Sequence, residues 1–152
     1  MDRIDKQILA LLQQDATLPV ADIAAQVGLT TTPCWRRIQQ LEQAGVIERR
    51  VALLSPHKLN VGVTVFMSIK AAEHSDAWFR HFAGVVASMP QIVEFYRMSG
   101  DTDYLLRVVV PDIAAFDGVY KRLIREVKLS DISSSFAMEQ IKFTTALPLD
   151  YA

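Results

Sequence analysis

TTTPCWRRIQQLEQAG, residues 30–45, predicts a helix with a defined beginning and end. Thr30 can offer its hydroxyl to the free amides of the first turn, and Pro33 still lies in that turn, where its missing N–H costs little. Gly45 can adopt the left-handed conformation that ends many helices. Apolar residues fall on one side of this helix at spacings of four and three, namely Cys34, Ile38 and Leu41.

The opposite side of the same helix carries hydroxyl, guanidinium and amide groups. A step of about 100° per residue places Thr32, Arg36, Gln39, Gln40 and Gln43 there, without a carboxylate. Arg can pair with guanine and Gln with adenine in a major groove. We therefore expect DNA contacts from Thr31, Thr32, Pro33, Arg36, Arg37, Gln39 and Gln40, with Arg49 and Arg50 on phosphates. Arg37 lies on the flank, where it either pairs with an acid or holds a phosphate.

Two shorter helical patterns precede this helix. Residues 2–14 carry an apolar stripe, and residues 19–27 form a second pattern that ends before Gly28. Three helices with a glycine turn between the last two predict a helix-turn-helix module. Residues 46–52 predict a short strand, so residues 1–54 are expected to form a winged helix-turn-helix domain.

The second half of the chain has a different period. Residues 55–60 predict a hinge, with Pro56 and Asn60 as turn residues. Residues 61–152 then predict strands and helices in the order βαββαβ, a ferredoxin-like α+β domain. The helix that Asp112 can cap is expected to bury Ile113, Phe116, Tyr120, Leu123, Ile124 and Val127. Both helices cover one face of the sheet, so the other face needs a partner.

Composition excludes several classes of protein. The 152 residues have a net charge of −1, which argues against general coating of nucleic acid. The single cysteine excludes an internal disulfide and fits a reducing cytoplasm. No stretch has the apolar length of a membrane span, and the charged N-terminus is not a signal peptide. We find no metal-binding spacing, catalytic constellation or cofactor motif.

Several segments together resemble the Lrp/AsnC family of transcription regulators. They are residues 27–34, 37–38, 41–47, 52–56, 100–105 and 138–142, and the resemblance covers nearly the whole chain. Two segments, the threonine–threonine–proline–cysteine–tryptophan run and residues 134–142, are most similar to the cysteine-responsive DecR-type branch. The resemblance implies a regulator of transcription that binds double-stranded DNA. It also implies a C-terminal RAM domain that forms homodimers through the open sheet face, and octamers from them.

The segment 99–104 is polar and turn-forming, and its spacing alone predicts a tight hairpin. The resemblance implies instead that this loop and the last strand line an amino-acid pocket at a subunit interface. Carried over, the effector-binding residues are Gly100, Asp101, Asp103, Tyr104, Ser133, Ser134 and Ser135. Side-chain alternation lets either Ser134, or Ser133 with Ser135, face the ligand. Cysteine is the first expected effector, and leucine or methionine the next.

Two other classes of function remain open from the sequence. Siroheme decarboxylases share the two-part architecture, but they would need histidines in a tetrapyrrole cavity, and His74 and His81 are poor candidates. The other alternative is a metabolite-binding module whose N-terminal helices only pack.

Overall fold

The computed structural model describes residues 1–152, which form two compact units that we describe separately. The first unit comprises Met1–Leu53 together with Ile141–Ala152, and the second comprises Leu54–Gln140. The sequence pattern placed residues 141–152 in the C-terminal domain, whereas the structure groups them with the N-terminal helices. None of the helices has the length and apolar character that crossing a membrane requires.

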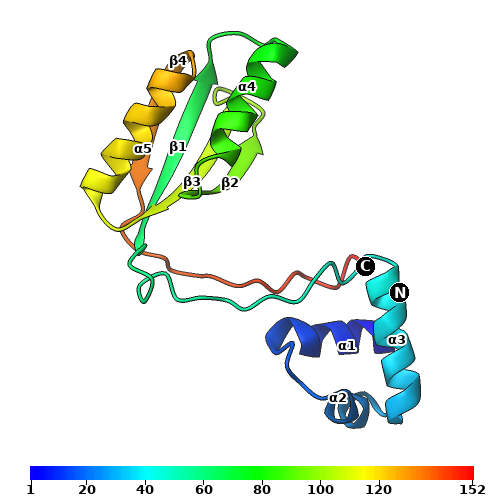
Figure 1. The fold of residues 1–152 in the computed structure, drawn as a ribbon. Helices are drawn as coiled ribbons and strands as arrows, with labels where there is room; N and C mark the ends of the chain where they lie inside the picture. Colours follow the sequence, from blue (N-terminus) through cyan, green and yellow to red (C-terminus); the bar gives the residue numbers. More distant parts are fainter. The chain divides into compact units, whose positions relative to one another are not determined.

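The N-terminal unit contains the three expected helices, α1 (Arg3–Gln14), α2 (Val20–Val27) and α3 (Thr31–Gln43) (Figure 1). Asp2 and Asp5 form a capping box at the start of α1. Gly28 has φ 73°, the left-handed conformation that turns the chain from α2 toward α3. The helices pack around a common core that includes the almost fully buried side chains of Ile8, Ile23, Cys34 and Ile38. The helix-turn-helix prediction is confirmed.

Two local expectations in this unit are wrong. Thr30 precedes α3, but its hydroxyl makes no capping hydrogen bond; its carbonyl oxygen instead accepts one from the Cys34 amide at 3.3 Å. Residues 46–52 do not form a strand. A strand needs a neighbour for its N–H and C=O groups, and this unit contains no other strand to pair with. The domain is therefore a helix-turn-helix without a wing strand.

The end of the chain packs onto α1. The side-chain amide of Gln13 donates to the Leu147 carbonyl oxygen at 3.2 Å, and its oxygen accepts from the Leu147 amide at 2.6 Å. Leu149 is partly buried against the core of the three helices. These contacts explain why the last twelve residues belong to the N-terminal unit.

The C-terminal unit has the predicted order of elements. These are β1 (Val63–Ala71), α4 (Asp76–Ala87), β2 (Ile92–Arg97), β3 (Tyr104–Val110), α5 (Ile113–Glu126) and β4 (Leu129–Phe136). The antiparallel sheet has the strand order β2-β3-β1-β4, so β1 pairs with β3 on one side and β4 on the other. Helices α4 and α5 contribute to one core against the sheet (Figure 1).

Alternation along β1 separates the two faces of this sheet. Val65, Met67 and Ile69 are fully buried beneath the helices, whereas Phe66 is 39% exposed on the other face. Trp78 and Phe82 of α4 fill the core opposite these strand residues. The prediction that the two helices cover only one face is confirmed.

The buried side of α5 differs from the predicted one. Asp112 caps the helix by accepting from the Ala115 amide at 2.8 Å, as expected. However, Ile113 is 71% exposed and Ile124 45% exposed, whereas Val119 is 4% exposed. The buried line runs through Phe116, Val119 and Leu123, at spacings of three and four, and Ile124 lies about 100° around the helix from Leu123.

Candidate DNA-reading face and effector region

The exposed side of α3 presents the polar groups that could contact DNA. Thr32, Arg36, Gln40 and Gln43 are exposed, while Cys34, Ile38 and Leu41 are buried on the opposite side. Thr31 and Pro33 are also exposed, in the first turn. Arg36 has no carboxylate within ion-pair distance. A free guanidinium on an exposed helix is available to a base edge or a phosphate.

Arg37 occupies the flank of α3 and is engaged within the protein. Its Nη1 lies 2.6 Å from Asp2 Oδ2 and 2.8 Å from Asp5 Oδ1. The pKa of Asp2 is lowered, first by the hydrogen bond from the Asp5 amide and then by Arg37. The two carboxylates raise the pKa of Arg37 in turn. Of the two roles expected for Arg37, pairing with acids is the one that the structure contains.

Glu42 engages two further residues that were expected on DNA. Gln39 donates to Glu42 Oε2 at 2.9 Å, and Arg50 Nη2 lies 2.9 Å from Glu42 Oε1. Arg49 is exposed and has no acid within ion-pair distance. Arg36 and Arg49 are therefore the two predicted DNA-contacting arginines whose guanidinium groups are free.

The polar loop between β2 and β3 is held by Asp103. Its backbone amide donates to the Ile69 carbonyl oxygen at 3.0 Å, and its carbonyl oxygen accepts from the Met98 amide at 2.8 Å. Its carboxylate accepts from the Ala71 amide at 2.8 Å. Asp101 is exposed and accepts no hydrogen bond from the chain. Gly100, with φ 102°, lets the backbone turn before these two acids.

Tyr104 is part of the core, although it was expected to face a ligand. It is 6% exposed, and its ring centroid lies 5.9 Å from that of Trp78, 5.3 Å from Phe82 and 5.5 Å from Phe95. Aromatic rings at such separations contribute packing energy of roughly 0.5–1.5 kcal/mol per pair beyond their burial. Tyr104 therefore anchors the end of the loop in the core through its packing against these aromatic rings.

The three serines of β4 divide between the two faces of the sheet. Ser134 lies opposite Met67 on the helix-covered face, and its Oγ is buried without a hydrogen-bond partner. Ser133 and Ser135 are exposed and lie opposite Ser68 and Phe66, on the uncovered face. Of the two arrangements that alternation allows, Ser133 with Ser135 is thus the pair on the open face.

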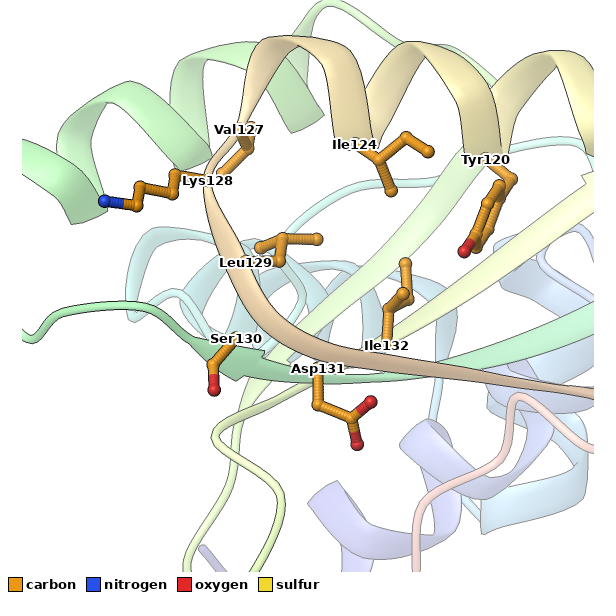
Figure 2. A pocket seen from close by; sticks show the side chains of 8 residues that line it. All are labelled: Tyr120, Ile124, Val127, Lys128, Leu129, Ser130, Asp131 and Ile132. Carbon is orange, nitrogen blue, oxygen red and sulfur yellow. The ribbon is translucent and has the colours of Figure 1, made fainter.

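A hollow of about 430 Å³ lies between α5 and β4, and none of the predicted effector residues lines it. Figure 2 shows Tyr120, Ile124, Leu129 and Ile132 turned toward it, while Lys128 and Asp131 point away. The helical spacing of apolar residues in the sequence had predicted that Ile124 lies in the core, whereas its side chain lines this hollow. All of its lining residues lie within residues 120–132, where the chain leaves α5 and enters β4, and the residue types of this stretch do not by themselves predict a hollow.

Comparison with known protein families matches both parts of the chain. Residues 1–42 match the AsnC-type helix-turn-helix domain, and residues 64–147 match the Lrp/AsnC ligand binding domain. Among characterised proteins, the DNA-binding transcriptional activator DecR of Escherichia coli K12 is 51% identical over 151 residues. That alignment covers 99% of each chain.

Solved structures agree with this match. An AsnC family transcriptional regulator from Agrobacterium tumefaciens is 65% identical, with a TM-score of 0.96, over 99% of each chain. The transcriptional regulator NMB0573 from Neisseria meningitidis, solved as a complex with L-Met, is 36% identical with a TM-score of 0.94. That similarity covers 99% of this chain and 98% of the other.

The contacts of Asp103 predict a structural cost for its removal. Asp103→Ala leaves the half-buried Ala71 amide without its acceptor and should destabilise the C-terminal unit by about 1–3 kcal/mol. Asp103→Asn keeps an oxygen in place and should cost clearly less. Urea unfolding followed by tryptophan fluorescence measures both variants. Equal stability of Asp103→Ala and the unaltered protein would show that the Ala71 contact does not stabilise the loop.

Proposed function

The chain belongs to the Lrp/AsnC family of transcriptional regulators, and from this we propose that α3 reads DNA sequence while the C-terminal domain senses a free amino acid. Its relatives are regulators and not enzymes, so the decarboxylase alternative is rejected. The N-terminal domain matches a DNA-binding family, which also argues against helices that only pack.

The observation that carries the DNA-binding proposal is the exposed, carboxylate-free part of α3. Arg36 and Gln40 lie one turn apart on this side, where they can reach neighbouring base edges in a major groove. Thr31 and Thr32 precede them in the first turn, the part of a recognition helix that approaches the bases most closely. Arg49 supplies a free cation for the phosphate backbone. Gln39 and Arg50 would have to leave Glu42 before contacting DNA.

Arg36 and Arg49 should respond differently to removal. Arg36→Ala should weaken binding to the preferred sequence by about 1–3 kcal/mol and leave random DNA nearly unaffected. Arg49→Ala should weaken both, and should reduce the dependence of affinity on salt by about one phosphate contact. Fluorescence anisotropy measures both variants, on a duplex selected from a random library by the unaltered protein and on a random duplex of equal length. Normal binding of Arg36→Ala across salt concentrations would remove Arg36 from the reading face.

We also propose that the uncovered sheet face joins two copies of the chain, and that dimers assemble further into octamers. Phe66 is 39% exposed at the centre of that face, and Ser68 and Ser135 flank it. A half-exposed aromatic ring on a strand that is paired on both sides gains energy when a second sheet covers it. A dimer also holds two reading helices at the spacing of two half-sites.

A charge on the open face should prevent this assembly. Phe66→Glu should shift the protein toward the 17.0 kDa of a single chain and weaken its binding to the selected duplex. Ile113→Glu is the matched control, because Ile113 is an exposed apolar residue on α5, away from that face. Light scattering at micromolar concentration measures the mass. A monomeric unaltered protein, or a Phe66→Glu variant of unchanged mass, would contradict the proposal.

For the effector, we propose a free amino acid with cysteine first and methionine or leucine next. The relative solved with L-Met supports an amino acid of this kind, and the resemblance to the DecR-type branch supports cysteine. Asp101 is the free carboxylate of the loop and suits the ligand's ammonium. Loop amides suit its carboxylate, and Ser133 and Ser135 supply hydroxyls on the open face. Asp103 holds the loop, and Tyr104 supports it from the core.

Asp101 and Asp103 should therefore separate in a binding experiment. Asp101→Asn should weaken the amino acid's binding by about 1.5–3 kcal/mol, the range for a hydrogen bond to a charged group. Asp103→Asn should keep most of the affinity. Calorimetry with each of the twenty amino acids under reducing conditions finds the ligand, and then compares the variants. A loss confined to Asp103→Asn would make Asp103 the ammonium partner, and no heat from any amino acid would contradict the effector proposal.

A further inference from the structure

Arg37 closes a small network at the start of α1. Asp2 Oδ1 accepts from the Asp5 amide at 2.8 Å, and Asp5 Oδ2 accepts from the Asp2 amide at 3.1 Å. The two remaining oxygens, Asp2 Oδ2 and Asp5 Oδ1, both accept from Nη1 of Arg37. All four carboxylate oxygens of the capping box are thus engaged, two by the backbone of α1 and two by a side chain of α3.

This network restricts the rotation of α3 about its own axis more closely than the apolar core does. The packing of Cys34, Ile38 and Leu41 against α1 and α2 is strong, but hydrophobic contact has little directional preference. Charge-assisted hydrogen bonds do have one. The Asp5 side chain is 18% exposed and that of Arg37 30% exposed, so solvent screens this pair less than a fully exposed one.

Arg36 and Arg37 occupy adjacent positions but project about 100° apart on the helix. Arg37 is tied to α1, and Arg36 is exposed and has no acid partner. A rotation of α3 about its own axis would move Arg36 and Gln40 across the groove and would also stretch the two bonds of Arg37. The Arg37 bonds therefore resist a rotation of α3 that would misalign its exposed residues.

We propose that Arg37 is a positioning residue for DNA recognition: held by Asp2 and Asp5, it sets the rotation of α3 and does not contact DNA. This inference rests on the proposed role of α3 as the reading helix. It assigns the first turn of α1, and Asp5 in particular, a part in sequence discrimination although neither faces DNA. A phosphate-binding Arg37 would behave in the opposite way, because Asp2 and Asp5 would then compete with DNA for its guanidinium.

Two single variants distinguish the two roles. Arg37→Ala and Asp5→Asn should both lower the ratio of affinities for the selected and the random duplex, on the order of tenfold, as expected when base contacts are misplaced. Both should leave the salt dependence of binding unchanged. If Arg37 contacts a phosphate, Arg37→Ala should weaken both duplexes equally and reduce the salt slope by about 0.9. Asp5→Asn should then bind as tightly as the unaltered protein, or more tightly.

Exchanging the charges provides a third measurement. Arg37→Asp combined with Asp5→Arg rebuilds an ion pair between α1 and α3 while moving the guanidinium off α3. Recovery of the affinity ratio relative to Arg37→Asp alone supports positioning, and absence of recovery contradicts it. Thermal melting identifies variants that have lost the fold, and Asp5→Asn, which keeps an oxygen for the Asp2 amide, carries the test if Arg37→Ala unfolds.

Arg36→Ala, measured in parallel, separates this inference from the one on which it depends. If neither Arg36→Ala nor Arg37→Ala lowers the affinity ratio, α3 is not the reading helix and both proposals fail. If only Arg36→Ala lowers it, the reading face stands and the positioning role of Arg37 is wrong.

Discussion

Side chains alternate along β1, and the arrangement of the whole C-terminal unit follows from this alternation because β1 pairs with a strand on each side. Val65, Met67 and Ile69 face the helices, so Phe66 must face away from them. The register carries the same division to β4, where Ser134 lies under the helices and its two neighbours lie on the open face. A slip of one residue would exchange the two faces completely. The face proposed for dimer formation is therefore a consequence of how the core is filled.

Neighbouring side chains of the same type have different surroundings in both units. Arg36 is free while Arg37 binds two carboxylates, and Asp101 is exposed while Asp103 anchors a loop. A guanidinium or a carboxylate suits several partners, and the partner that lies within reach decides which contact forms. The chemistry proposed for each surface therefore depends on the polar side chains that have no partner within the protein. These are only some of the polar residues that the sequence suggested for each site.

The chain passes between its two units twice, once near Leu54 and again near Ile141. The second passage follows β4, the strand that carries the three serines. Beyond it, the backbone of Leu147 is hydrogen-bonded to the Gln13 side chain of α1, and Leu149 packs against the core of the three helices. A regulator must favour one arrangement of its parts over another when a ligand binds. In this protein the C-terminal sheet and the N-terminal helices are joined by two covalent segments, one of which is fastened by hydrogen bonds to the first helix.

The three N-terminal helices, the order of the elements in the C-terminal unit, the cap at Asp112 and the buried side of α3 were all predictable from the sequence. They depend on periods of 3.6 and 2 residues and on the local conformations of a few residues, so neighbours along the chain encode them. The tertiary structure alone decided that Val119 is buried in place of Ile124, that residues 46–52 have no strand to pair with, and that Arg37 binds Asp2 and Asp5. It also decided which serines lie on the open face and where the chain's last residues pack. Each of these outcomes joins groups that are far apart in the sequence, and no local period specifies which distant group will come within reach.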